Sequence, residues 1–328
     1  MPAVSVVIPT MDRWGLLSER ALRSALTQEQ VDLEVVVVDD SATDETAIGI
    51  AGMNDERVRV IRHEQPQGLQ RARNVGIAAA RGDWVAFLDD DDVWAPWKLR
   101  RQLDVAAASD ATFIYSPALY VTGEQVELAP ALEPEGLGPR LLAGEAIPAG
   151  GSNVMVKTEL VRKVGGFDEA ITHLGDFDLF IRLDPISKAA RCDEPLLAYI
   201  QQSAGMHLHD LDLVPEDVRH LNRKYEAEYE ALGRQFDGEQ FVVWVAEQHE
   251  VAGRVRDAGR VYLTAAWHYR RPKYLGHAAT LLPGRRVRNA ALRLAGRIRG
   301  RDYTSAATDA SRHYPPPAWL APHLSQSS

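Results

Sequence analysis

The first 90 residues alternate short apolar runs with stretches that have helical spacing, and this alternation constrains the fold more than any other feature. Strands separated by helices of this length predict βαβ units with right-handed crossovers, and therefore an α/β fold with a mostly parallel sheet. Because the runs are apolar throughout, we expect helices on both faces of the sheet. The expected strands are 4–8, 33–38, 58–61 and 84–88, and the expected helices are 16–28, 43–52 and 69–80.

The 328 residues are about twice the length of a typical domain, so we expect more than one structural region. Between 111 and 148 proline and glycine are frequent, which predicts loops and edge strands. Helical patterns follow one another beyond residue 213, with breaks at Pro272 and Pro283. We therefore expect an α/β domain over 1–213, a helical C-terminal region over 214–302 and a loose tail over 303–328.

Composition and charge exclude several classes of protein. Hydrophobic residues make up 45% of the chain and charged residues 25%, which is typical of a globular protein and not of a disordered one. The net charge of -9 argues against a nucleic-acid partner. The single cysteine, Cys192, excludes an internal disulfide, and no apolar stretch approaches the ~20 residues of a membrane helix. We therefore expect a cytoplasmic protein.

Two of the expected strands end in acidic residues. Asp39 and Asp40 follow the second strand, and the consecutive residues 89–92, all aspartate, follow the fourth. Ligands of an open parallel sheet bind at the carboxyl ends of its strands. Adjacent carboxylates repel one another unless a cation compensates them, and Mg²⁺ is commonly held by one or two carboxylates together with substrate phosphates. The strand ends therefore predict a site for a metal ion and a diphosphate.

The acidic pair and its basic neighbours also have a structural interpretation. Asp39 and Asp40 alone are explained as readily by a helix cap and a turn. Four consecutive aspartates exceed what capping requires. Arg71, Arg73 and Asn74 begin the helix between the two acidic strand ends, where guanidinium groups are suited to binding phosphate. Arginines at such positions are otherwise part of the solvated surface.

Four segments together resemble the inverting glycosyltransferases of family two, which have the GT-A fold. They occur in the family's order and spacing over roughly the first 200 residues, and the set is far more specific than any one of them. The segments are VSVVIPTMDR at 4–13, VVVVDDSATDET at 35–46, GLQRARNVGIAAARGDWVAFLDDDDVW at 68–94 and VGGFDEAITHLGDFDLFIRL at 164–183.

This resemblance implies a nucleotide-sugar donor, usually uridine-based, at the carboxyl edge of the sheet. In the family the base lies over the end of the first strand, which here carries Pro9 and Thr10, with Arg13 nearby. Asp40 matches the carboxylate that hydrogen-bonds the pyrimidine ring. Arg73 matches a basic residue on the donor side.

The resemblance also implies a metal ion, Mn²⁺ or Mg²⁺. In the family's Asp-x-Asp element the middle residue faces the ribose and the last coordinates the metal, which assigns these roles to Asp90 and Asp91. His207 follows the last strand of the domain and matches a histidine that completes the metal site in several GT-A enzymes. Gly151 matches the stretch that approaches the donor sugar, where the absence of a side chain lets the backbone come close.

An inverting transfer requires a base that takes the proton of the acceptor hydroxyl. The resemblance assigns this role to Asp176 at the start of a helix, where a helix-stabilising acid is the alternative. The family often has glutamate before this aspartate, whereas this chain has Gly175. Asp178 is the second candidate, although its spacing favours an ion pair with Arg182.

The sequence does not identify the acceptor, and it leaves two rival functions to be considered. The acceptor hydroxyl could belong to a lipid-linked saccharide, a polysaccharide, a protein or a small metabolite. A phosphatase of the haloacid dehalogenase class would use Asp89 and Asp91, but it leaves the segment around Phe167 unexplained. A non-catalytic nucleotide-binding module would keep Asp40 and Asp91 but would not need a base at Asp176.

The segment 284–301 is rich in arginine and has no acidic residue. Apolar residues recur on one helical face of it, so we expect an amphipathic basic helix. Such a helix can lie on anionic lipid headgroups, which would make the protein peripheral at the inner membrane face. Its alternative is a helix that packs on the body of the protein.

Overall fold

The computed structural model describes residues 1–201, 213–233, 236, 238–281 and 314–324. The chain divides into two compact units. The first comprises Met1–Gln201 together with His313–Ser328, and the second comprises Gln202–Arg312.

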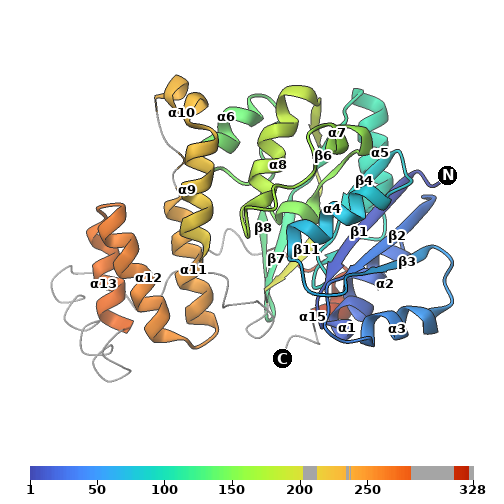
Figure 1. The fold of residues 1–328 in the computed structure, drawn as a ribbon, viewed down its shortest axis with the longest axis horizontal. Helices are drawn as coiled ribbons and strands as arrows, with labels where there is room; N and C mark the ends of the chain where they lie inside the picture. The colour runs from blue at the N-terminus through green and yellow to red at the C-terminus, as the bar shows by residue number, and fades with distance from the viewer. Residues whose placement is uncertain (202–212, 234–235, 237, 282–313, 325–328) are drawn as a thin grey trace. The chain divides into compact units, whose positions relative to one another are not determined.

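A seven-stranded sheet forms the centre of the first unit (Figure 1). Its strand order is β10-β6-β9-β4-β1-β2-β3, so the first strand of the chain lies in the interior. β9 is antiparallel to both of its neighbours, while β1 is parallel to both β2 and β4. The α/β fold with a mostly parallel sheet is therefore confirmed. The strands are β1 (Val4–Thr10), β2 (Leu33–Asp39), β3 (Val58–Arg62), β4 (Trp84–Phe87), β6 (Phe113–Tyr115), β9 (Met155–Lys157) and β10 (Ala189–Arg191).

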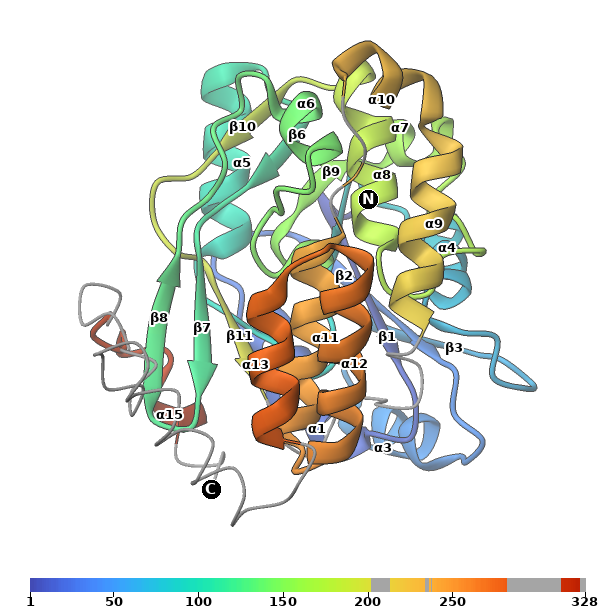
Figure 2. The ribbon, with the colours of Figure 1, turned by 90° about the vertical axis from the view of Figure 1, so that its left-hand side faces the viewer.

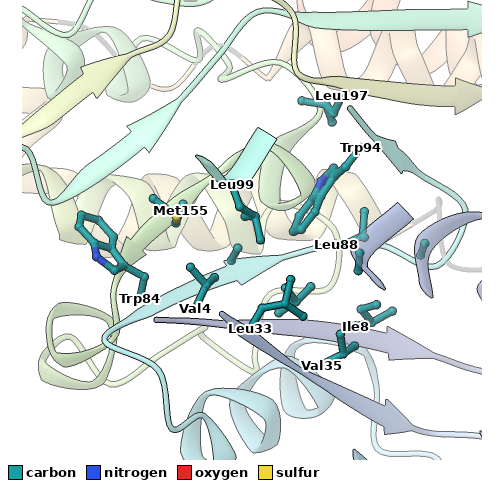
Figure 3. Close-up of a cluster of buried hydrophobic side chains, with 14 of the residues drawn as sticks. Val4, Ile8, Leu33, Val35, Trp84, Leu88, Trp94, Leu99, Met155 and Leu197 are labelled. Carbon is teal, nitrogen blue, oxygen red and sulfur yellow. The ribbon is translucent and has the colours of Figure 1, made fainter. Parts of the chain in front are cut away.

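Helices pack on both faces of this sheet. On one face the core is formed by side chains such as Val4, Ile8 and Leu33, together with Trp94 and residues of the helices that cover them (Figure 3). The helical segments on this face are α1 (Trp14–Leu16), the π-helical turn η1 (Leu17–Ala21), α2 (Leu22–Leu26) and α5 (Lys98–Ser109). α3 (Glu45–Met53) contributes one buried residue, Ile50, to the same cluster.

The opposite face is covered by α4 (Leu69–Ala79), which packs against β1 and β2 (Figure 1). Gly76 permits this close approach, because a Cβ atom there would lie 2.2 Å from Cγ1 of Val7. α7 (Thr158–Lys163) contacts α4, and α8 (Gly175–Leu183) packs Phe180 against Phe113 of the sheet. Both faces of the central sheet are thus buried, as the continuous apolar runs predict.

A second, four-stranded sheet has the order β5-β11-β7-β8. Its strands are β5 (Val93–Trp94), β7 (Ala118–Thr122), β8 (Gln125–Ala129) and β11 (Leu197–Gln201). The irregular region 111–148 therefore contains β6, β7, β8 and α6 (Leu137–Leu142).

Part of the expected loose tail is packed against this second sheet. Leu320 is fully buried in a cluster with Val121, Val126 and Ile200, and the backbone N–H of Tyr314 donates to the carbonyl of Val126. A short helix, α15 (Ala321–Leu324), follows near the ends of β7 and β8 (Figure 2). For residues 314–324 the expectation of a loose tail is wrong, because apolar side chains within a polar terminal segment fill a position on the sheet.

The described part of the second unit is helical. Its helices are α9 (Val214–Lys224), α10 (Glu226–Leu232), α11 (Glu239–Val251), α12 (Val255–His268) and α13 (Pro272–Leu281). The last three bury a cluster that includes Ala246, Ala258, Tyr262 and Tyr274. Within the described ranges, no helix combines the length and apolar character needed to span a bilayer. The basic segment 284–301 lies outside the described residues.

Candidate active site

The carboxyl ends of β4, β1 and β2 lie next to one another because these strands are parallel neighbours. This edge therefore brings together Thr10, Asp40 and the aspartates 89–92, as the sequence predicts. Pro9 is buried in β1, where it pairs in register with Val38.

Asp40 is 5% exposed, and its carboxylate accepts hydrogen bonds from the backbone of the loop between β3 and α4. Its Oδ1 accepts from the backbone N–H of Gln67 at 2.8 Å, and its Oδ2 accepts from that of Gly68 at 2.8 Å. Oδ1 also lies 2.6 Å from Nδ1 of the buried His63. These contacts were not evident from the sequence, which has no spacing rule that would pair His63 with Asp40. Each carboxylate oxygen has two lone pairs, so Oδ2 keeps acceptor capacity for a base.

Asp90 is held by the end of β1 and the loop that follows it. Its Oδ2 accepts from the hydroxyl of Thr10 at 2.7 Å, and its Oδ1 pairs with Nη2 of Arg13. The pKa of Asp90 is raised to about 7, chiefly by burial; the charge of Arg13 opposes this shift, the charge of Asp91 adds to it, and the hydrogen bond from Thr10 opposes it.

Asp91 is the more accessible carboxylate, with 26% of its side chain exposed. Its Oδ2 lies 2.7 Å from the same Nη2 atom of Arg13, and its backbone carbonyl accepts from Nη1 of Arg20 at 3.4 Å. Arg13 therefore places one positive charge between Asp90 and Asp91. Carboxylate oxygens are the protein ligands suited to Mn²⁺ or Mg²⁺.

Among the described residues, no three His, Cys, Asp or Glu side chains form a group that could hold a metal ion. Asp91 fits a site in which the protein supplies few ligands and a diphosphate supplies the others. His207 lies outside the described residues. Asp92 is 1% exposed, and burial raises the pKa of its carboxyl group, followed by the charges of Asp91 and Asp89.

Arg73 links the acidic run to the expected base. Its side chain is 2% exposed, its Nη2 donates to Oδ1 of Asp89 at 2.7 Å, and its Nη1 donates to Oδ1 of Asp176 at 3.0 Å. The guanidinium carbon lies 5.0 Å from the ring centre of Phe167, which gives the buried cation a favourable aromatic face. The structure thus brings Asp89, Arg73 and Asp176 together from β4, α4 and α8.

Asp176 is also held by the turn Gly150–Asn153. Its Oδ2 accepts from the backbone N–H of Gly151 at 3.0 Å, and its side chain is 20% exposed. Gly150 has φ +48, and a Cβ atom there would lie 2.4 Å from Oδ2 of Asp176. Burial raises the pKa of Asp176, the positive charge of Arg73 lowers it, and Asp89 raises it again.

The position before the expected base, Gly175, lies close to the side chain of Gln70. A Cβ atom on Gly175 would lie 2.5 Å from Nε2 of Gln70, which itself donates to the carbonyl of Thr172 at 3.0 Å. Asp178, the second candidate base, is fully buried and receives the guanidinium of Arg182, with Nε at 2.8 Å. Its ion pair is the one that the helical spacing favours.

Arg71 and Asn74, which the sequence groups with Arg73, have other partners in the structure. Arg71 pairs with Glu169 at 3.1 Å, in an ion pair that is about half exposed. Asn74 donates to the carbonyl of Phe167 at 3.0 Å and accepts from its backbone N–H at 2.7 Å. On a helix, residues two positions apart face different sides, so Arg71 faces away from the side on which Arg73 enters the site.

Comparison with known proteins agrees with this geometry. A model of glycosyl transferase family 2 matches residues 5–165. The chain belongs to glycosyl transferase family 2. A relative of this family 2 chain in Haemophilus influenzae, called an uncharacterized glycosyltransferase, is 32% identical over 59% of this chain and 66% of the relative. The Escherichia coli UDP-Glc:alpha-D-GlcNAc-diphosphoundecaprenol beta-1,3-glucosyltransferase WfgD is 30% identical over 34% of this chain and 44% of the relative.

A solved structure extends the likeness to the fold. The mannosyltransferase PcManGT from Pyrobaculum calidifontis, in complex with GDP-Man and Mn²⁺, has a TM-score of 0.54 and 18% identity over 90% of this chain and 80% of that chain. The fold of the family 2 chain is GT-A, as the sequence motifs imply. The chain spans less than two thirds of the curated relatives just described, with 66% and 44% of their lengths covered.

Proposed function

We propose that this family 2 chain transfers a sugar, with inversion, from a UDP-sugar to an acceptor hydroxyl in a reaction that depends on Mn²⁺ or Mg²⁺. The observation that carries the proposal is the bridge formed by Arg73. Arg73 pairs with both Asp89 and Asp176, and so holds the carboxylate of Asp176 beside the acidic run at the strand ends. A base and a nucleotide-binding edge that share one arginine are close enough for a sugar bound between them to undergo displacement.

Asp176 takes the acceptor proton in this proposal. Each of its carboxylate oxygens accepts one hydrogen bond, from Arg73 and from Gly151, and these bonds fix the orientation of the group. A carboxylate oxygen has a second lone pair, which can accept the proton of the hydroxyl that attacks the sugar. The partial exposure of Asp176 gives the acceptor access to it.

The donor nucleotide lies along the strand ends in the proposal. Oδ2 of Asp40 accepts from the base over Pro9 and Thr10, and Asp90 binds the ribose from a carboxylate that Thr10 and Arg13 orient. Gly151 faces the donor sugar. Asp91, with His207 as the resemblance implies, would hold the metal ion, which would stabilise the charge of the departing diphosphate.

The names of relatives support particular substrates. WfgD is named for a UDP-glucose donor and a diphosphoundecaprenol-linked acceptor, and PcManGT was solved with GDP-Man and Mn²⁺. We therefore propose a lipid-linked saccharide as acceptor for this chain and a role in polysaccharide or glycoconjugate synthesis. A cytoplasmic location, with the segment 284–301 at an anionic membrane face, is part of the same proposal.

Neither alternative function accounts for the geometry as well. A phosphatase nucleophile at Asp89 would have its carboxylate paired with the buried Arg73. A non-catalytic nucleotide-binding module would need neither the buried link to Asp176 nor the turn at Gly150 that accommodates its carboxylate.

The test is a thermal-shift panel of nucleotide sugars and nucleoside diphosphates, each with Mn²⁺ and with EDTA. A ligand that binds only the folded protein stabilises it by about 2.7 kcal/mol at a hundredfold excess over Kd. We expect a UDP compound to raise the Tm with Mn²⁺, and most of the shift to disappear with EDTA or in Asp91→Asn. An equal shift for UDP in EDTA would contradict the metal bridge, and no shift with any nucleotide would contradict the function.

A further inference from the structure

Arg13 bridges Asp90 and Asp91, the two carboxylates that the proposed function assigns to the ribose and the metal ion. One guanidinium nitrogen, Nη2, contacts both Asp90 and Asp91, at 2.7 Å from Oδ2 of Asp91. An arginine side chain stays cationic in a protein. A metal ion bound to the carboxylate of Asp91 would lie beside this guanidinium, and adjacent positive charges repel each other. Arg13 and a metal ion therefore compete for Asp91.

The position of Arg13 allows it to leave. It follows β1 in the loop that begins α1, and 18% of its side chain is exposed. The backbone of this loop is fixed independently, since the N–H of Asp12 donates to the hydroxyl of Ser41 at 2.7 Å. The long arginine side chain can therefore rotate while the backbone of the site stays in place.

We infer that Arg13 exchanges partners when the donor binds, leaving Asp91 for the diphosphate and so coupling metal binding to nucleotide binding. This inference rests on the proposed function, because it takes the acidic run as the site of a metal and a nucleoside diphosphate. The guanidinium of Arg13, once it leaves the carboxylate of Asp91, can bind a phosphate group of the donor through two parallel hydrogen bonds. Metal alone must displace Arg13 without offering it a new partner.

The exchange predicts reciprocal coupling. The metal ion binds weakly alone and more tightly when the nucleotide is bound. The affinity for the nucleotide increases by the same factor when the metal ion is bound. Such coupling factors are typically about 5–150-fold. Without the guanidinium, the metal has no competitor at Asp91 and the diphosphate loses a partner, so both changes reduce the coupling.

The experiment measures Mn²⁺ affinity by electron paramagnetic resonance, with and without UDP or GDP, in the full chain. Wild type should gain at least ~10-fold in Mn²⁺ affinity from the nucleotide that binds. In Arg13→Gln, Mn²⁺ alone should bind about 5-fold more tightly, and the gain from nucleotide should fall below ~3-fold. Arg13→Lys keeps the charge but not the planar fork, so it should also reduce the gain; it carries the test if Arg13→Gln fails to fold.

Arg20→Gln is the matched control. Arg20 lies beside the same motif, and its Nη1 donates to the backbone carbonyl of Asp91. It should keep the wild-type coupling. The inference is overturned if Arg13→Gln retains wild-type Mn²⁺ affinity and coupling, or if Arg20→Gln loses coupling to the same extent. Failure of both UDP and GDP to bind wild type with Mn²⁺ would instead contradict the proposed function itself.

Discussion

Replacing Arg73 by glutamine should move the acid limb of the pH–kcat profile to higher pH. Asp176 must be ionised to accept a proton, and Arg73 donates to it at 3.0 Å from a fully buried position. A hydrogen bond to a charged group contributes about 1.5–3 kcal/mol. Because Arg73 stabilises the charged form of Asp176, loss of this bond should raise the pKa of Asp176 and move the acid limb with it.

The same substitution should also destabilise the fold. It leaves Asp89 and Asp176 without their shared cation, and removing one partner of a buried ion pair costs about 3–5 kcal/mol. Urea denaturation measures this loss at a pH where wild type is stable. Arg71→Gln is the control on the same helix, because its half-exposed pair with Glu169 is worth about 0–1 kcal/mol.

The pH profile separates these two effects, because a purely structural role would lower stability without moving the limb. We would measure kcat between pH 5 and 9, at about 0.5-unit steps, on the donor and acceptor that bind, for wild type and both variants. A limb for Arg73→Gln that coincides with that of wild type would refute the reasoning that Arg73 sets the ionisation of Asp176.

Two further substitutions test the turn and the C-terminal segment. Gly150→Ala should lose about 1–3 kcal/mol of stability in urea and most of its kcat, because the new methyl group meets Asp176 at a positive φ. Gly136→Ala, also at positive φ but with open space around it, isolates the backbone contribution and should keep its kcat. Leu320→Ala should destabilise the first unit by about 2–5 kcal/mol, and an unchanged urea midpoint would mean that 314–324 does not dock.

The sequence predicted the parts of the fold that follow from local periodicity. The runs at 4–8 and 33–38 became β1 and β2, and the helix expected at 69–80 became α4. The sequence predicted edge strands between 111 and 148 but not the bounds or the pairing of β7 and β8, because short strands among prolines and glycines carry no clear alternation. Leu320 was missed for a different reason, since its partners lie more than a hundred residues earlier in the chain.

For the candidate site, the sequence predicted which residues gather but not how they are bonded. The strand ends locate Thr10, Asp40 and the aspartates 89–92 at one edge, because parallel strands end together. The bridge from Arg73 to Asp176 joins residues that are 103 positions apart, and no local pattern encodes it. The departure at Gly175 is visible in the sequence, but its neighbour, the side chain of Gln70, is visible only in the structure.

The most direct test of the central claim is the turnover of Asp176→Asn compared with that of Asp178→Asn. A base acts in the transition state and not in donor binding, so Asp176→Asn should keep its affinity for UDP and Mn²⁺ while kcat falls by roughly 10²–10⁴. Asp178 pairs with Arg182 inside α8, so Asp178→Asn should lose stability and little of its kcat. Near-normal turnover by a folded Asp176→Asn would contradict the assignment of the base, and an inactive but folded Asp178→Asn would move that role to Asp178.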